Sequence, residues 1–108
     1  MLKRQFLADK KTCKVTFTFD PVACEDVEEV AVLGDFNGWD ATANPMKRGL
    51  KNGSFSATTK LACGKRYQFR YLINGLLWEN DAAADDYVPT PFGDSDNSVI
   101  DLNEVSNQ

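Results

Sequence analysis

The sequence predicts an all-β fold in which two antiparallel sheets pack face to face, on three observations. Apolar and polar residues alternate with a period of two along several short segments, as in strands that bury one face. Segments rich in Gly, Asn, Asp and Pro separate these strands at regular intervals. The length of 108 residues suits one domain with a modest core. Together the observations favour a single immunoglobulin-like β-sandwich domain over residues 1–108.

Three strands are predicted between residues 13 and 61. Residues 13–19 (CKVTFTF) alternate a cysteine and three apolar side chains with Lys and Thr, and a proline soon ends the strand. Residues 28–34 (EEVAVLG) have the apolar content of a buried strand, and residues 54–61 (SFSATTKL) alternate again. Only residues 1–9 leave room for a helical turn, and no α-helix longer than about two turns is expected.

The second half of the chain predicts a hairpin and a last strand. Residues 66–73 (RYQFRYLI) alternate aromatic and polar side chains, Asn74-Gly75 is a strong turn signal, and residues 76–79 (LLWE) return. Residues 97–102 (NSVIDL) form the last predicted strand. The side chains expected to face the core are Phe17, Val32, Phe55, Phe69 and Tyr71.

The charge of the chain argues against two kinds of partner. The formal net charge is −4 and the pI is about 4.7, and basic residues do not cluster beyond the dispersed start of the chain. We therefore expect neither nucleic acid nor an anionic membrane as a partner. No apolar run has transmembrane length, and the N-terminus lacks the apolar stretch of a secretory signal.

The three cysteines indicate a reduced protein. Their odd number and their spacing fit neither a complete disulfide framework nor a zinc site. Cys13 alternates with the apolar residues of its strand, which predicts a buried thiol. We therefore expect a reducing, cytoplasmic environment, with a Cys13–Cys24 bridge as the alternative that thiol titration would test.

The chain has no histidine, which removes His-dependent nucleophiles and the commonest metal ligand. Carboxylate catalysis would need a pair of acids in a pocket. The candidate acids lie in turn-like segments, where solvated loop acids and Asx turns are favoured over catalysis or a calcium loop. These acids are Asp81, Asp85, Asp86, Asp94 and Asp96. The chain is therefore not expected to be an enzyme, and no catalytic residue, metal or cofactor is predicted.

Residues 33–40 (LGDFNGWD) place a tryptophan in a hydrophilic loop. Indole is mostly buried in folded proteins, and a buried indole N–H needs a hydrogen-bond partner. Trp39 therefore either packs under its own loop or is displayed for a ligand to stack on. The polar residues around it favour display.

The order of motifs along the chain resembles that of a known family. A strand ending in VAVLGDFNGWD is followed by NPMKR, GSFSATTKL, CGKRYQFRYLING, LLWEND and FGDSDNSVIDL. This series is similar to the family-48 carbohydrate-binding modules, the isoamylase N-terminal or early-set domains of glycogen branching and debranching enzymes and of the AMP-activated protein kinase β subunit. The resemblance is strongest over residues 28–102. It implies a β-sandwich that binds α-glucan and has no catalytic activity of its own.

The resemblance also implies a sugar-binding site. In glycogen-binding members a Trp ends the first loop motif, a basic residue precedes the hairpin, and a second Trp follows the hairpin turn. The matching residues here are Trp39, Arg70 and Trp78. An Asn that opens the last strand corresponds to Asn97, and a loop residue that wedges against the sugar corresponds to Phe92. Flat aromatic rings cover the apolar face of glucose, and Arg and Asn hydrogen-bond its hydroxyls.

Two of these residues also have ordinary structural interpretations. Arg70 lies on the polar side of its strand, where a surface salt bridge with Glu79 is as well supported by the pattern as a ligand contact. Asn97 could cap a turn, which is the more frequent role of Asn in such a loop.

The position of Trp78 depends on the register of the hairpin. A two-residue turn would pair Tyr71 with Trp78 and place the indole in the core, because facing residues share a side of the sheet. A three-residue loop would pair Leu72 with Trp78 and place the indole on the side of Arg70. The residues leave both registers open, and the resemblance favours the second.

The resulting expectation is a stand-alone, non-catalytic module for α-1,4-glucan polysaccharide or maltooligosaccharide of the glycogen or starch type. Only six residues follow the last predicted strand, so no catalytic domain is expected after it. Glycogen- or starch-metabolising enzymes are the expected protein partners. The alternative is a protein-interaction module that keeps the sandwich but has lost sugar binding. A small glycosidase ranks far behind, because no pocket-like pair of acids is predicted.

Overall fold

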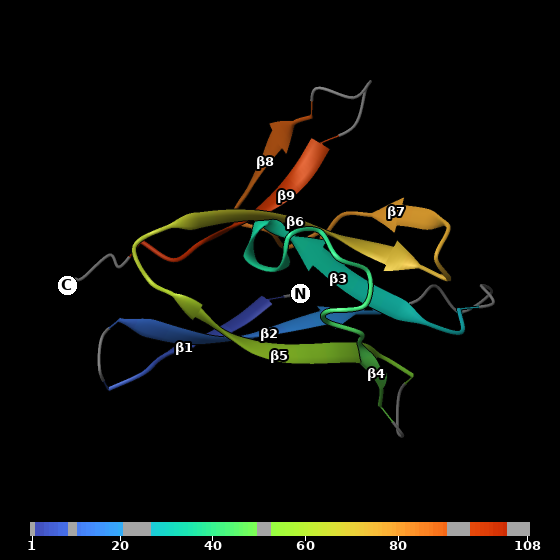
Figure 1. The fold of residues 1–108 in the computed structure, drawn as a ribbon, viewed down its shortest axis with the longest axis horizontal. Coiled ribbons are helices and arrows are strands. Elements are labelled where there is room, and N and C mark those ends of the chain that lie inside the picture. Colours follow the sequence, from blue (N-terminus) through green and yellow to red (C-terminus); the bar gives the residue numbers. More distant parts are fainter. Residues whose placement is uncertain (1, 9–10, 21–26, 50–52, 91–95, 104–108) are drawn as a thin grey trace.

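The computed structural model describes residues 2–8, 11–20, 27–49, 53–90 and 96–103 and consists of two antiparallel sheets (Figure 1). The first sheet has the strand order β1 (Leu2–Phe6), β2 (Thr12–Phe19), β5 (Phe55–Ala62) and β4 (Lys47–Arg48). The second sheet has the order β3 (Val30–Gly34), β6 (Arg66–Ile73), β9 (Asp96–Asp101) and β8 (Asp86–Pro89), and β7 (Leu77–Glu79) also pairs with β6. The predicted all-β, immunoglobulin-like sandwich is confirmed.

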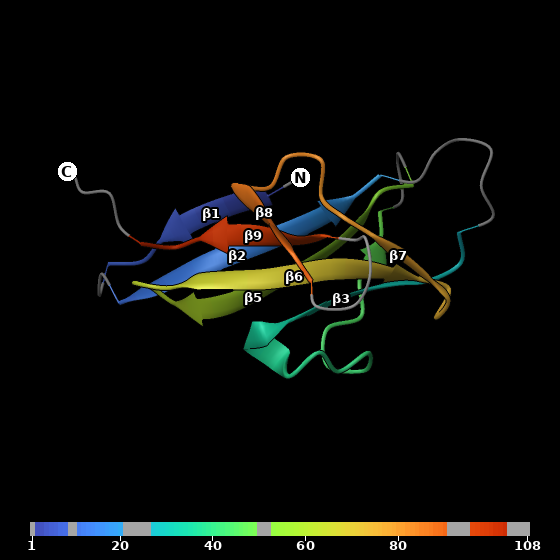
Figure 2. The ribbon, with the colours of Figure 1, turned by 90° about the horizontal axis from the view of Figure 1, so that it is seen from above.

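Strand β6 organises the second sheet. Strand β3 pairs along one edge of β6, while β9 and β7 share the other edge, at residues 66–69 and 71–73 respectively. Figure 2 looks down onto this sheet and shows the 3₁₀ turn η1 (Asp35–Asn37) with the loop after it lying outside β3. The loop after β3, the β6–β7 hairpin and the start of β9 therefore all border on β6.

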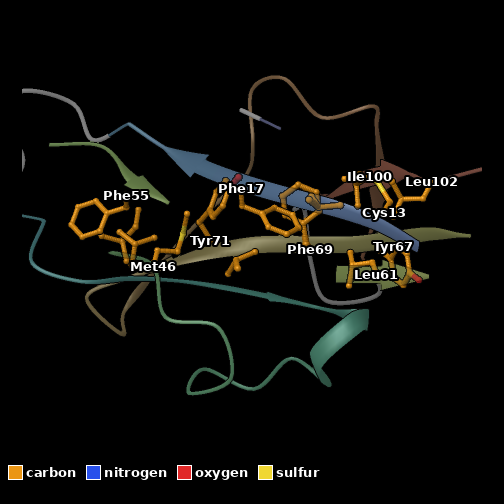
Figure 3. Packing of buried hydrophobic residues seen from close by; sticks show 14 of the residues in the cluster. Cys13, Phe17, Met46, Phe55, Leu61, Tyr67, Phe69, Tyr71, Ile100 and Leu102 are labelled. Atoms are coloured by element: carbon orange, nitrogen blue, oxygen red, sulfur yellow. The ribbon is translucent and has the colours of Figure 1, made fainter. Parts of the chain in front are cut away.

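The core between the sheets holds the alternating apolar side chains of both (Figure 3). All five residues expected to face inward are at most 2% exposed, which confirms the predicted alternation. Phe69 from β6 meets Phe17 from β2 edge to face, with ring centroids 5.1 Å apart. Because such aromatic pairs add to the burial energy of the rings, this contact ties the two sheets together at their centre.

The N-terminal residues differ from the expectation, because Leu2–Phe6 form a strand rather than a helical turn. This strand pairs with β2, whose edge supplies backbone hydrogen bonds that an isolated short helix would not form stably. Arg4 then fastens the strand to the second sheet. Its guanidinium forms a salt bridge with Asp85 Oδ2 (2.9 Å) and donates to the Asp101 carbonyl (3.2 Å).

Asp81 corrects the expectation of solvated loop acids, since it is only 2% exposed. Its Oδ2 accepts a hydrogen bond from the Tyr71 hydroxyl (2.6 Å), and its backbone N–H donates to Ser98 Oγ (2.9 Å). These bonds satisfy polar groups that would otherwise be costly to bury. The Ala83 N–H donates to Oδ1 (2.8 Å), so the predicted Asx turn is present within this buried setting.

The other candidate acids lie at the surface where the structure describes them. Asp85 and Asp86 are exposed and form salt bridges with Arg4 and Arg66. Asp96 is also exposed, and Asp94 lies outside the described residues.

Cys13 is a buried, unbridged thiol, as predicted, and burial raises the pKa of this thiol. Cys63 is a partly buried thiol at the edge of the core. Cys24, the other half of the alternative bridge, lies outside the described residues. Within the described ranges, no helix has the length and apolar character needed to cross a membrane.

Candidate functional site

The loop after β3 is built around the side chain of Asn37. Its Oδ1 accepts hydrogen bonds from the backbone N–H groups of Gly34 (3.0 Å) and Trp39 (3.1 Å). Its Nδ2 donates to the Val32 carbonyl (3.0 Å) and to Asn44 Oδ1 (2.7 Å). One amide side chain therefore closes the loop with both its acceptor and its donor.

Gly34 allows the backbone at the start of this loop to pass very close to β6 and to the ring of Phe36. A Cβ added at this position would lie 2.6 Å from the Gln68 carbonyl oxygen and 2.7 Å from the ring of Phe36. Any other residue would have to move backbone atoms of β6. The glycine of the GDFNGW motif is thus explained by packing against β6 rather than by backbone strain.

Trp39 adopts an uncommon backbone conformation. Its φ of 59° lies in the left-handed region, where bulky residues are rare. Such a conformation costs on the order of 1–3 kcal/mol and persists where surrounding contacts hold it. Asp35 supplies one such contact, because its Oδ1 accepts from the Trp39 indole N–H (3.1 Å) and its Oδ2 accepts from the Gln68 backbone N–H (2.9 Å). A single carboxylate thus ties the indole to β6.

The β6–β7 hairpin has the three-residue loop that the resemblance favours, and this register is confirmed. Leu72 pairs with Trp78 and Ile73 pairs with Leu77, which leaves residues 74–76 in the loop. Because paired residues share a side of the sheet, the Trp78 indole lies on the outer face of the second sheet. Trp78 is 46% exposed.

Arg70 lies at the centre of this outer face. Its Nε donates to Asn97 Oδ1 (2.6 Å), and its guanidinium carbon lies 5.9 Å from the centroid of the Trp78 ring. The second distance is within the range of cation–π attraction. Asn97 in turn donates from Nδ2 to Gln68 Oε1 (2.9 Å), which fixes the amide that Arg70 contacts. The arginine therefore lies between Asn97 and Trp78.

The two tryptophans complete the group. Their ring centroids lie 6.5 Å apart and their planes are inclined by 60°. The contacts therefore run in a closed circuit from Trp39 through Asp35, β6, Asn97 and Arg70 to Trp78 and back to Trp39. We call the side chains of Trp39, Trp78 and Arg70 the aromatic platform.

The structure brings four of the five predicted site residues together, namely Trp39, Arg70, Trp78 and Asn97. Phe92 lies outside the described residues. Trp39 is partly exposed. This exposure is intermediate between the two alternatives, full display and packing under its own loop.

The ordinary interpretations of Arg70 and Asn97 do not describe their observed contacts. Glu79 pairs with Tyr71, so its side chain leaves the strand on the opposite side of the sheet from Arg70, and the salt bridges seen between described residues do not include this pair. The side chain of Asn97 bridges Arg70 and Gln68 instead of capping a turn.

Asp35 and Gln68 support the site and were not predicted from the sequence. Gln68 could have been found from alternation, because it lies two residues before Arg70 and shares its side of β6. Asp35 carried no such signal, since an acid in a turn-rich loop normally faces water. Its role depends on the approach of β6, which is distant in sequence.

The platform has the chemistry of a binding surface. Indole faces offer flat apolar area, while the arginine and asparagine side chains offer planar hydrogen-bonding groups at its border. Among the described residues, no group of three or more Cys, Asp or Glu side chains is placed to hold a metal ion. The fold and the platform together define a β-sandwich module suited to a ligand with flat apolar faces and a polar rim.

Comparison with known proteins assigns the family. Residues 15–88 match the model of carbohydrate-binding module 48, the isoamylase N-terminal domain. The chain belongs to this family, as its motifs predict, and its class of ligand is therefore carbohydrate. A search among curated proteins finds no match.

Proposed function

We propose that the chain is a non-catalytic module that binds α-1,4-glucan of the glycogen or starch type by stacking glucose rings on Trp39 and Trp78. The observation that carries the proposal is the arrangement of the two indoles, 6.5 Å apart and inclined by 60°. Successive glucose units of an α-1,4 chain turn relative to one another. Two inclined aromatic faces therefore suit this chain better than one flat surface does.

Stacking uses the physical properties of both partners. A glucose ring presents an apolar face of C–H groups and a rim of hydroxyls. An indole covers the C–H face at low conformational cost, because it has only two side-chain torsions. The partial exposure of both tryptophans supports this role and also predicts weak binding to single short chains, because a shallow site buries little of its ligand.

Arg70 and Asn97 would contact hydroxyls at the sugar rim. The guanidinium is planar and presents its donors in a fixed fork. Its Nε–H is engaged by Asn97, which sets the orientation of the fork beside Trp78. An ordered fork loses less conformational entropy on binding than a mobile side chain does.

The proposed module is non-catalytic, and the structural role of Asp35 supports this part of the proposal. This carboxylate is hydrogen-bonded within the site, and each of its oxygens already accepts an N–H that holds the loop. Glycosidases instead use a pair of carboxyl groups flanking the bond to be cleaved.

The test is titration with maltoheptaose followed by tryptophan fluorescence. Both tryptophans of the chain belong to the platform, so the signal reports on it directly. We expect saturable binding in the wild type and weaker binding in Trp39→Ala, Trp78→Ala and Arg70→Ala. Phe6→Ala is the matched control, since Phe6 is 41% exposed on β1 in the other sheet. A wild-type protein without any response would refute the proposal for this ligand.

Affinity electrophoresis in glycogen separates the proposal from its rivals. Bovine albumin serves as the unretarded control. Retardation of the chain would support glucan binding, and loss of the polymer would instead indicate an enzyme.

The second candidate function is a protein-interaction module of the same fold. The observation in its favour is the tip of the β6–β7 hairpin, where Leu76 is 79% and Leu77 is 61% exposed. Exposed apolar side chains next to a binding surface are frequent at protein interfaces. Glycogen- or starch-metabolising enzymes are the proposed partners. Unchanged mobility in glycogen, together with no response to maltoheptaose, would favour this second function.

A further inference from the structure

The first sheet concentrates positive charge. Its four strands contain six basic residues and no acidic residue, although the whole chain has 12 basic and 16 acidic residues. Two of the six are engaged: Arg4 forms a salt bridge with Asp85, and Arg48 lies over the ring of Phe55. The other four are exposed and alternate with the core positions, so they lie on the outer face. We call this group of Lys3, Lys14, Lys47 and Lys60 the lysine face.

Two of these lysines lie directly opposite each other. Lys14 on β2 pairs with Lys60 on β5. Side chains at opposed positions begin about 4.5–5.5 Å apart, and like charges there destabilise a sheet. The next pair on the same face is Thr16 and Thr58, whose hydroxyls hydrogen-bond to each other (2.9 Å) and supply no counter-charge. The salt bridges seen between described residues do not involve either lysine. An anionic group of a ligand could supply the counter-charge for this Lys–Lys pair.

The width of the lysine face matches the length of a short extended peptide. Lys3 and Lys47 lie on the two outer strands of the order β1-β2-β5-β4. Three interstrand spacings separate these strands, which is about 14 Å. An extended polypeptide covers that distance with about four residues at roughly 3.3 Å each.

Two shallow depressions lie along the lysine face, and one of them is lined in part by Lys14 of the pair. One of about 400 Å³ is lined in part by Lys3, Lys14 and Thr16, and another of about 360 Å³ is lined in part by Lys47 and Thr58. The first thus combines two ammonium groups with one hydroxyl, and the second combines one ammonium group with the hydroxyls of Ser56 and Thr58. These are the donors that carboxylate groups accept from.

We propose that the lysine face binds an acidic segment of a partner protein, with Asp or Glu carboxylates lying between Lys14 and Lys60. A long polyanion fits this surface less well. Outside the four strands of the first sheet the chain has six basic and 16 acidic residues, and this excess of negative charge disfavours nucleic acid or an anionic membrane as the partner. A segment of a few residues meets the lysine face alone.

The lysine face and the aromatic platform lie on different sheets. Figure 1 shows β2 and β5 in the lower sheet and β6 and β7 in the upper one. The inference therefore goes beyond glucan binding and does not depend on it. An acidic partner segment and a glucan chain would occupy opposite outer faces at the same time.

The experiment measures the anisotropy of fluorescein-labelled hexaglutamate with the full chain at about 10 mM salt, where the screening length is about 30 Å. We expect saturable binding that weakens at physiological salt and falls at least about tenfold in Lys14→Gln/Lys60→Gln. Lys65→Gln is the matched control, because Lys65 is also exposed but lies outside the first sheet. Lys14→Gln alone should also raise the melting temperature slightly, since it removes the like-charge pair. The double variant should respond to maltoheptaose like the wild type, so failure of this inference and failure of glucan binding are distinguishable.

Several outcomes would overturn the inference. Labelled hexaglutamate that does not bind at low salt would do so, as would an equal loss in Lys65→Gln. Tighter binding of an oligothymidylate of equal charge or of phosphatidylserine vesicles would assign the face to nucleic acid or membrane instead. Concentration-dependent self-association that Lys14→Gln/Lys60→Gln abolishes would assign it to a second copy of the chain.

Discussion

Leu72 pairs with Trp78 across the β6–β7 hairpin, and this pairing turns the indole outward. In the other register its neighbour would be Tyr71, which is 1% exposed at the core. Asn74 and Gly75 both have positive φ values (53° and 69°), as the inner residues of a tight hairpin turn require. Leu76 follows as an extra loop residue.

Deleting Leu76 should leave the platform intact. The loop would then contain Asn74 and Gly75 alone, and Leu72 would still face Trp78. We expect maltoheptaose affinity within about twofold of the wild type, because less than about 0.5 kcal/mol would be lost. Deleting both Leu76 and Leu77 should weaken maltoheptaose binding about as much as Trp78→Ala does, since Trp78 would then face Ile73 on the opposite side of the sheet.

Fluorescence titration of the two deletion variants, with circular dichroism to confirm folding, checks this prediction. A folded Leu76 deletion without a response would show that the extra residue positions the indole in some other way.

Asp35→Ala should weaken maltoheptaose binding about tenfold, or about 1.4 kcal/mol. The substitution removes the acceptors of the Trp39 indole N–H and the Gln68 backbone N–H, so the left-handed conformation of Trp39 loses support. Asp40→Ala is the matched control, since the Asp40 carboxylate bonds only within its own turn, to Thr42. Isothermal titration of both variants provides the measurement. Equal affinities in the two would mean that Asp35 does not position the indole.

Phe69→Ala should lower the free energy of unfolding by about 3–5 kcal/mol, because it empties a site at the centre of the core. Trp39→Ala and Arg70→Ala should cost much less, since both residues are partly exposed. Urea unfolding followed by far-ultraviolet circular dichroism compares the three variants. If Trp39→Ala unfolds the protein while Trp78→Ala still binds sugar, Trp39 is a packing residue.

Tyr71 should make the protein sensitive to alkali. Burial and, secondarily, the hydrogen bond to Asp81 raise the pKa of its hydroxyl above the ordinary value of 10.0. Above about pH 10 the unfolded chain loses this proton while the folded chain keeps it, so the free energy of unfolding falls as pH rises. The slope from this one group approaches about 1.4 kcal/mol per pH unit.

Urea unfolding between about pH 8 and pH 11, from about two units below the ordinary tyrosine pKa to about one unit above it, checks the alkaline loss of stability. Tyr71→Phe should be less stable than the wild type at neutral pH, because Asp81 loses a buried hydrogen bond, and its stability should fall less steeply above pH 10. A parallel fall in both proteins would assign the alkaline loss to other groups.

The strands with strong alternation could be predicted from the sequence alone. β2, β5 and β6 each bury one side, and a period of two marks that side without knowledge of partners. β1, β4 and β8 could not be predicted in this way. β4 has two residues, and β1 and β8 are largely exposed, so pairing with a neighbouring strand decides their conformation.

Asp81 shows the same limit for a single side chain. Its charge and its turn-rich surroundings indicate solvent exposure, but the Tyr71 hydroxyl and Ser98 provide partners within the fold. Burial of an acid depends on those partners, and they come from other strands. Local sequence carries no trace of them.

For the candidate site too, the sequence identifies the residues and the tertiary structure decides how they are arranged. The motifs of the chain were sufficient to name Trp39, Arg70, Trp78 and Asn97. Whether these side chains meet was decided by the tertiary structure, because a shift of one residue in hairpin register moves Trp78 from one face of the sheet to the other. Backbone pairing between β6 and β7 selects the register, and the carboxylate of Asp35 holds Trp39 against β6 from a loop more than thirty residues earlier in the chain.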